Sequence, residues 1–211
     1  LTNKREYIFN LDLNIEQNSF FKFTFSYPAD EKAKEDMQLA LMKKEVEKQE
    51  NIEFVLLDNE NSLSLVINTI PRDAIVSFDT ETTDIDVRKA KIVGFSFAYE
   101  ENKAYYVPIA HSYLGVGNQI SKEAAYQAIV QLNKYKLVLQ NFKYDFEIIK
   151  NNFDLELKLY ADTMILSWLL DTNEKVGLDY QIEKYFNHKM IAFKDVVKKG
   201  ENFSNVDISN A

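Results

Sequence analysis

The stretch that most constrains the fold of this chain is AIVSFDTETTDI, from Ala74 to Ile85. It starts as a short apolar run, typical of a buried strand, and then reaches two acidic residues, Asp79 and Glu81. Side chains two apart in an extended strand point to the same face. These two carboxylates are therefore expected to project together, on the side opposite Phe78 and Thr80.

Two neighbouring carboxylates at the end of a buried strand repel each other unless a proton or a cation lies between them. An oxygen-rich site of this kind suits a hard divalent ion such as Mg²⁺ or Mn²⁺. A D-x-E pattern alone also fits an ordinary polar surface. The apolar residues Ile75, Val76 and Phe78 favour the site, because buried carboxylates are costly without a partner.

Composition limits the classes of function that remain. The chain has 211 residues, 46% of them hydrophobic and 27% charged, which is ordinary for a globular protein with a sizeable core. It has no cysteine, which excludes disulfides, thiolate catalysis and cysteine-based zinc sites and fits a reducing compartment. Two histidines, His111 and His188, are too few for a histidine-rich metal site. No apolar run approaches the roughly 20 residues that cross a bilayer, so no membrane role is expected.

The net charge of −8, from 25 basic and 33 acidic residues, argues against a protein held to nucleic acid by charge alone. It does not exclude a nuclease. Such an enzyme can hold a strand end through metal ions and base stacking while a partner domain supplies the basic groove.

From residue 51 onward, apolar periodicity predicts alternating elements. Strands are expected over residues 52–58, 74–79, 91–100, 103–110 and 136–140, and helices over residues 60–70, 122–134, 144–153, 163–170 and 178–186. Short turns separate the second, third and fourth strands, which indicates an antiparallel meander. Helix 163–170 is apolar throughout, which predicts burial on several sides. The whole indicates an α/β layered domain with a mixed sheet.

Residues 1–50 carry less information. The stretches YIFNLDLNI and SFFKFTFSY alternate apolar and polar residues and are each a candidate strand. Residues 30–50 form a candidate helix of mixed charge, either a solvated surface helix or one that binds a partner.

A second polar cluster follows the strand predicted at 136–140. There a helix begins close to Asn141 and has Asp145 in its first turn. One interpretation is structural: Asn141 caps the helix, and Asp145 offsets the helix dipole. The other is functional, because α/β sheets place ligand sites at the carboxyl ends of their strands, where both acidic clusters lie.

Several motifs together resemble one family. FDTETT at Phe78–Thr83 and NFKYD at Asn141–Asp145 resemble the first and second motifs of the proofreading 3′–5′ exonuclease domain of bacterial DNA polymerase I, in the DEDD exonuclease superfamily. Further matches follow in the same order: AYYVPIAHSYL, QIS, ADTMILSWLL and GLDYQIEKYFNHKMIAFKDVVKKG. The resemblance covers roughly residues 51–211 and implies an RNase H-like exonuclease fold, a mixed central β-sheet flanked by helices.

The resemblance also implies a reaction, hydrolysis of the 3′-terminal phosphodiester of DNA. In this family two divalent ions, about 3.5–4 Å apart, clamp the scissile phosphate. The match places Asp79 as a bridging ligand, Glu81 on the metal that activates water, and Asp145 on the second metal. The expected cofactors are two Mg²⁺ or Mn²⁺ ions, and the products are nucleoside monophosphates.

The same match assigns residues to the DNA strand. Thr82 corresponds to a residue near the 3′-hydroxyl, and Ile85 to an apolar wedge against the last bases. Phe193 corresponds to an aromatic that stacks on the terminal nucleotide, a contact that tolerates any base. Asn141 and Tyr144 fall in the second motif and are also expected to contact DNA.

Structural alternatives remain for these and nearby residues. Ile85 and Phe193 also fit core positions, and Asn141 fits a helix cap. Asp162 is expected to be a helix cap, and His111, in a loop after a strand, to be structural. Lys143 fits either a surface lysine or one that faces phosphate.

One family motif is missing. The third motif carries a tyrosine followed four residues later by an aspartate, and no such pair follows residue 189. FSNVDISNA, at the end of the chain, resembles the segment just before that motif. The chain is therefore expected to be an internal piece of a polymerase I, truncated before the last motif and weakly active or inactive.

The sequence leaves three functions open. The first is the exonuclease domain at 51–211, with residues 1–50 as a linker or the end of a preceding segment, a polymerase domain after it, and a location in the bacterial cytoplasm. The second is a non-catalytic domain that positions DNA or braces the polymerase. The third is a free-standing exonuclease of the same superfamily that acts on RNA.

Overall fold

The computed structural model describes residues 52–211. In this part of the chain six strands form one sheet in the order β1-β4-β3-β2-β5-β6. The strands are β1 (Glu53–Leu56), β2 (Ile75–Thr82), β3 (Ile92–Glu100), β4 (Lys103–Pro108), β5 (Lys136–Leu139) and β6 (Leu159–Asp162). The helices are α2 (Glu60–Thr69), α3 (Lys122–Leu132), α4 (Phe142–Phe153), α5 (Thr163–Leu170), α6 (Leu178–Phe186) and α7 (Phe193–Val196), followed by two 3₁₀ turns, η2 (Phe203–Asn205) and η3 (Ile208–Asn210).

The sheet is mixed, as the sequence predicts. Strands β2, β3 and β4 pair antiparallel in chain order, which confirms the meander. The outer pairs β1–β4, β2–β5 and β5–β6 are parallel, and helices connect the strands where the chain has to return to the same end of the sheet. Strand β6 is an element that the sequence analysis did not predict.

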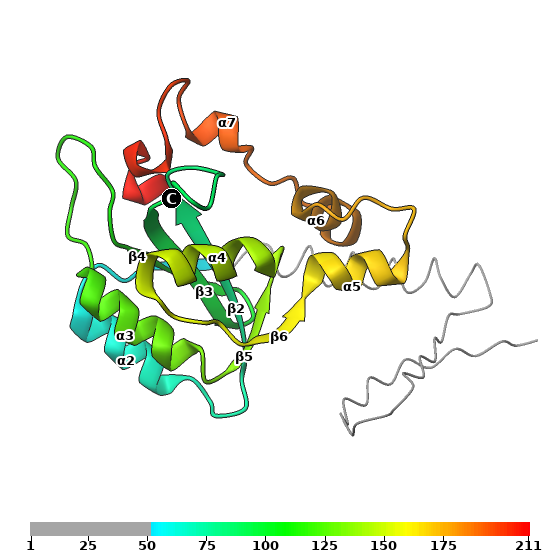
Figure 1. Ribbon diagram of the computed structural model, residues 1–211, viewed down its shortest axis with the longest axis horizontal. Coiled ribbons are helices and arrows are strands. Elements are labelled where there is room, and N and C mark those ends of the chain that lie inside the picture. The colour runs from blue at the N-terminus through cyan, green and yellow to red at the C-terminus, as the bar shows by residue number, and fades with distance from the viewer. Residues whose placement is uncertain (1–51) are drawn as a thin grey trace, which may run out of the picture. The chain divides into compact units, whose positions relative to one another are not determined.

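One face of the sheet carries the main core. Helices α2 and α3 lie side by side, and α4 packs on β2 and β3 (Figure 1). Apolar residues of the central strands meet Leu63 and Ile67 of α2, Ile129 of α3, and Ile148 and Ile149 of α4. The elements of this layer are therefore held by burial, which stabilises at about 25 cal/mol per Å² of apolar surface.

The C-terminal segment packs against the opposite face near Val93, whereas Ile75 and Ser77 on that face of β2 are exposed. In the β2–β3 ladder Glu81 pairs with Gly94 and Thr82 with Ile92, so Val93 lies in a β-bulge. Val93 is fully buried with Val197, Phe203 and Val206, separately from the main core. Its carbonyl oxygen accepts hydrogen bonds from the amides of Ile109 and Ala110, both at 2.8 Å. Through the side chain of Val93, the bulge thus provides an apolar contact that holds residues 196–206 against the sheet.

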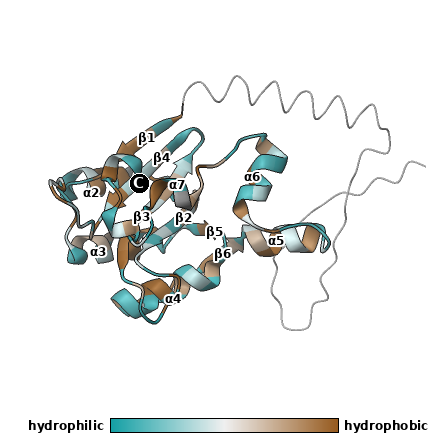
Figure 2. Ribbon diagram, turned by 90° about the horizontal axis from the view of Figure 1, so that it is seen from above, coloured by the Kyte–Doolittle hydropathy of each residue, from teal (hydrophilic) through white to brown (hydrophobic). Residues whose placement is uncertain are grey.

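The prediction that α5 is buried on several sides is wrong. Ile165, Trp168 and Leu169 are each about half exposed, and Ser167 is the buried residue of the helix. Both views place α5 and α6 beyond the β6 edge of the sheet, and Figure 2 shows how apolar α5 is. Continuous apolarity does not reveal this placement, because a helix leaving an edge strand meets the sheet on one side only.

Two predicted helix caps and one predicted helix are confirmed, and the elements predicted before residue 51 are not described by the structure. Ser121 caps α3 and Asp162 caps α5, as expected. Helix α6 forms where amphipathicity predicts it. The predicted strands and helix within residues 1–50 lie outside the described residues. In residues 52–211 no helix is both long and apolar enough to cross a membrane.

Candidate active site

The acidic pair lies on β2 as the alternation predicts. Phe78 and Thr80 are buried toward the core, whereas Asp79 is exposed and Glu81 is partly buried. Across the ladder, Asp79 faces Ser96 and Glu81 faces Gly94. Both carboxylates therefore belong to the face that the C-terminal segment borders, not to the face of the main core.

Asp145 reaches the same strand from α4. Its carboxyl oxygen Oδ1 accepts hydrogen bonds from the amide of Thr80 at 3.1 Å and from the hydroxyl of Thr80 at 2.6 Å. Strand β5 pairs with β2 only as far as Ser77, so β2 runs on beyond its parallel neighbour. The Thr80 amide beyond that point is available to a side chain, and Asp145, which is almost fully buried, takes it.

The three carboxyl groups influence one another electrostatically. Burial, followed by the charges of Asp79 and Asp145, raises the pKa of Glu81 to about 8. Burial and the charge of Asp79 raise the pKa of Asp145 to about 7, although the Thr80 hydrogen bonds oppose the rise. Desolvation also raises the pKa of Asp79, even though one side of this residue keeps access to solvent. The site therefore favours protons or another source of positive charge.

The carboxylates fit a divalent cation by their chemistry, because hard oxygen ligands are those that Mg²⁺ and Mn²⁺ prefer. The positions of these carboxylates, however, do not form a finished metal site. Among residues 52–211 no group of three or more His, Asp or Glu side chains is placed so that it could hold a metal ion as it stands. Asp79 and Glu81 leave one face of β2, and Asp145 approaches from the α4 side, so the ligands surround the strand end without closing on one point.

A second group of contacts ties the loop after β2 to α4. The Tyr144 hydroxyl lies within hydrogen-bond distance of the Thr82 hydroxyl and donates to the carbonyl of Asp84 at 2.8 Å. The next residue, Ile85, is 92% exposed. The alternative that Ile85 is a core residue is therefore wrong, and the structure brings Thr82 and Tyr144 together.

The interpretation of Asn141 as a side-chain cap is wrong. Asn141 occupies the N-cap position of α4 in a left-handed conformation (φ 64°), but its side chain makes no capping hydrogen bond. Asp162 supplies the cap instead, accepting from the amides of Asn141 at 3.2 Å and Phe142 at 2.9 Å. Because β5 and β6 are parallel neighbours, the end of β6 lies beside the start of α4. The Asn141 side chain is exposed and does not take part in capping α4.

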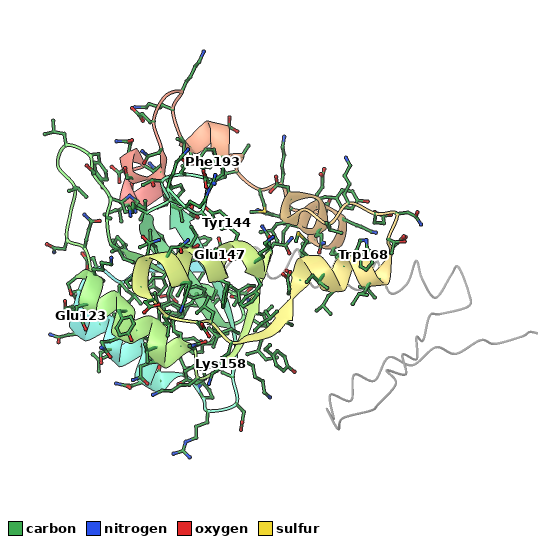
Figure 3. The ribbon with its side chains drawn as sticks, in the orientation of Figure 1. Glu123, Tyr144, Glu147, Lys158, Trp168 and Phe193 are labelled. Carbon is green, nitrogen blue, oxygen red and sulfur yellow. The ribbon has the colours of Figure 1, made fainter. Side chains whose placement is uncertain are left out.

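Phe193 opens α7 with 65% of its surface exposed, which contradicts the core alternative for this residue. Figure 3 shows Phe193 on α7 and Tyr144 on α4. Lys143 is also exposed. Among the described residues, no ring contact involves Phe193.

His111 is structural, and it reveals residues that the sequence analysis missed. Its buried ring meets the Tyr106 hydroxyl at 2.6 Å through Nε2 and the Val206 carbonyl at 2.9 Å through Nδ1. Tyr106 and Thr80 were not predicted as site residues. Alternation along β4 puts Tyr106 on the face opposite Tyr105, but its place on the same face as Asp79 follows from the strand register, which the sequence does not show.

Comparison with known proteins identifies the family. The family model described as 3′–5′ exonuclease matches residues 54–209. The chain belongs to the 3′–5′ exonuclease family. This exonuclease domain carries the two acidic motifs on β2 and α4, where the sequence resemblance placed them.

Curated relatives are bacterial DNA polymerases. The exonuclease domain is 35% identical over 165 residues to DNA polymerase I of Borreliella burgdorferi, covering 77% of this chain and 18% of that protein. It is also 35% identical over 158 residues to DNA polymerase I of Pseudomonas aeruginosa, covering 72% of this chain and 17% of that protein. The chain thus spans less than a fifth of the length of these relatives.

Solved structures confirm the RNase H-like fold. Escherichia coli RNase D, an exoribonuclease involved in structured RNA processing, superposes with a TM-score of 0.53 at 12% identity, over 72% of this chain and 39% of that one. The catalytic core of RRP6 from Trypanosoma brucei gives the same TM-score at 12% identity, over 74% and 42%. At such identities the likeness concerns the fold.

Proposed function

We propose that this domain removes nucleotides from the 3′ end of single-stranded DNA, as the proofreading part of a DNA polymerase I. The observation that carries the proposal is that Asp79, Glu81 and Asp145 lie around the end of β2, near enough for their charges to raise the pKa values of Glu81 and Asp145, in a chain of the 3′–5′ exonuclease family. The 35% identity to polymerase I relatives supports DNA as the substrate.

Asp79, Glu81 and Asp145 would hold two divalent cations, Mg²⁺ or Mn²⁺. When bound, such ions stabilise charge at a phosphodiester under attack. The raised pKa values of Glu81 and Asp145 support this role, because a cation relieves the same repulsion that a proton relieves.

The remaining residues would hold the strand. Thr82 and Tyr144, joined by their hydroxyl groups, form a polar contact for the terminal nucleotide. Exposed Ile85 and Phe193 offer apolar surface for bases, and exposed Asn141 offers an amide. Stacking and wedge contacts of this kind suit an editor that removes all four nucleotides.

We also propose a domain organisation. Residues 51–211 form the exonuclease domain, and residues 1–50 are the end of a preceding 5′-nuclease segment, in support of which the family model begins at residue 54. A polymerase domain would follow, and the parent protein would act in the bacterial cytoplasm, as the bacterial polymerase relatives suggest.

The test uses single-stranded DNA labelled at its 5′ end, with Mn²⁺ or Mg²⁺, an excess of the 211-residue chain and a denaturing gel. We expect slow shortening from the 3′ end, slow because the chain lacks a Tyr-x-x-x-Asp pair after residue 189. Asp79→Ala should abolish the shortening. Asp73→Ala, which changes an exposed acid just before β2, should not.

Two outcomes would contradict the proposal. Shortening that survives both Asp79→Ala and chelation of the metal would exclude the acidic site. Preference for an RNA strand of the same sequence would exclude the DNA polymerase assignment in favour of an exoribonuclease.

A further inference from the structure

The feature of interest is the packing of Tyr106 across Gly94, beside the acidic pair. Tyr106 stands on β4 opposite Ser96, which stands opposite Asp79 on β2, so the three share one face of the sheet. A Cβ atom built on Gly94 would lie 2.3 Å from the Tyr106 hydroxyl oxygen. The hydroxyl therefore occupies the space where a side chain of residue 94 would begin.

That position is directly beside Glu81. Gly94 is the cross-strand partner of Glu81, and cross-strand partners have Cβ positions about 5 Å apart. The Tyr106 hydroxyl thus replaces the missing side chain of Gly94 as the neighbour of Glu81. A glycine is required at position 94 because the Val107 carbonyl oxygen also lies only 2.9 Å from the added Cβ.

The Tyr106 hydroxyl is held from its other side by His111. The Val206 carbonyl accepts only, so Nδ1 of His111 carries the proton that it donates at 2.9 Å. Burial lowers the pKa of His111, so the ring is neutral and Nε2 accepts the Tyr106 proton at 2.6 Å. Gln119 fixes the His111 backbone through hydrogen bonds at 2.6 and 3.0 Å.

Because the Tyr106 hydroxyl donates its proton to His111, only the lone pairs of its oxygen face Glu81. As a metal ligand Glu81 must be ionised, and an ionised carboxylate has no proton to donate to that oxygen and is repelled by it. The oxygen also fills the space above Gly94 into which the carboxylate could otherwise turn. Both effects direct Glu81 away from β3 and toward the open side of the acidic site.

We propose that Tyr106 is a positioning residue of the acidic site: its hydroxyl, held by His111 above Gly94, fixes the direction of the Glu81 carboxylate. His111 also donates to the backbone carbonyl of Val206, so the hydrogen bonds of one histidine connect the Tyr106 hydroxyl beside Glu81 to the C-terminal segment. The inference rests on the proposed function in one respect, that Glu81 is a metal ligand.

The test compares Tyr106→Phe with Tyr105→Phe in the whole chain. Tyr105 is its neighbour on β4, faces the main core, and meets the hydroxyl of Tyr99 at 3.3 Å. The two variants thus each remove one partly buried hydroxyl, on opposite faces of one strand. The first readout is the side-chain carboxyl ¹³C resonance of Glu81, without metal, at about pH 9.5, above its raised pKa.

We expect Tyr106→Phe to move the Glu81 resonance and Tyr105→Phe to leave it in place. The second readout is Mn²⁺ binding by calorimetry, where Tyr106→Phe should weaken affinity about tenfold, as expected for residues that orient metal ligands. Tyr105→Phe should not weaken it. Tyr106→Met, which also removes the hydroxyl and leaves Gly94 unchanged, should move the Glu81 resonance as well and serves if Tyr106→Phe fails to fold.

The outcomes separate the two proposals. An unmoved Glu81 resonance in a folded Tyr106→Phe or Tyr106→Met chain overturns the positioning role. If the resonance moves but the unsubstituted chain binds no Mn²⁺, the positioning role stands and the proposed metal-dependent function fails. Equal movement of the resonance in Tyr105→Phe would show a general loosening of β4 and also overturn the inference.

Discussion

At the residue scale, Thr80 links the two acidic motifs. Its amide and its hydroxyl both donate to the Oδ1 atom of Asp145, a buried carboxyl group. Removing a donor from a buried charged group costs more than the hydrogen bond contributes, because the acceptor is left without solvent. The position of Asp145 at the end of β2 therefore depends on a residue that carries no charge itself.

We predict that Thr80→Val destabilises the fold by about 1–3 kcal/mol at pH 8. The folded pKa of Asp145 is about 7 against an ordinary value of 3.8, so stability is lost as pH rises through the folded value and the group ionises. Loss of the Thr80 hydroxyl raises that pKa further, so the variant should suffer less at pH 5, where Asp145 keeps its proton.

The measurement is denaturant unfolding at both pH values. Thr172→Val, at an exposed turn residue, is the control and should change stability by less than about 0.5 kcal/mol. Equal destabilisation by Thr80→Val at pH 5 and pH 8 would contradict a role through the Asp145 charge.

At the scale of elements, Asp162 joins two helices. Its carboxylate accepts from the amides of Met164 at 2.9 Å and Ile165 at 3.4 Å in α5, and also from the first amides of α4. One buried side chain thus caps α5 in the usual local way and α4 across parallel strands. Asn141 does not cap its own helix with its side chain, and it takes a left-handed conformation (φ 64°) instead of the extended one typical of a capping residue.

We predict that Asp162→Ala costs about 2–4 kcal/mol, because it removes caps from two helices and leaves buried amides without acceptors. Ser121→Ala is the control, since Ser121 caps only α3, accepting from the amide of Ala124 at 3.2 Å, and its hydroxyl also donates to Glu60 at 2.6 Å. It should cost about 1 kcal/mol. Equal losses for the two variants in urea unfolding would show that the α4 cap contributes nothing.

Helix α5 provides a second prediction at this scale. Leu169 is 52% exposed, whereas Ile149 of α4 is fully buried. We expect Leu169→Ser to cost less than about 1 kcal/mol and to reduce aggregation, because it removes exposed apolar surface. Ile149→Ala should cost about 2–5 kcal/mol. A large loss of stability for Leu169→Ser would restore the sequence-based view of a buried α5.

At the scale of the whole molecule, proton and metal binding should compete. With pKa values of about 8 and about 7, Glu81 and Asp145 hold protons in the acid range. Ligand carboxylates must be deprotonated, so metal binding releases those protons and weakens as pH falls.

We predict that Mn²⁺ affinity falls at least about tenfold from about pH 8 to about pH 6. Calorimetry in two buffers of different ionisation enthalpy measures both the affinity and the protons released. Asp73→Ala should behave like the unsubstituted chain, because Asp73 is exposed and apart from the site. A flat affinity over this range, with no proton release, would contradict the raised pKa values.

Much of the fold followed from the sequence. Alternation along β2 predicted that Phe78 turns inward and Asp79 outward, and short turns predicted the meander. The resemblance assigned Asp79, Glu81 and Asp145 to one metal site, which stays a prediction; the charges of Asp79 and Asp145 do raise the pKa of Glu81. The sequence failed at β6, an edge strand whose first two residues are exposed and whose four residues show no alternation of apolar and polar side chains, and at α5, where apolarity did not indicate exposure.

The sequence by itself determined which side chains share a face of each element, because that periodicity follows from covalent geometry and needs no partner. Only the tertiary structure decided which elements meet. That Asp145 takes the Thr80 amide depends on β5 ending short of β2. That Tyr106 lies beside Glu81 depends on the order β4-β3-β2 and on a glycine between them. Such contacts join residues distant in the chain, and packing of the sheet brings them within hydrogen-bond distance.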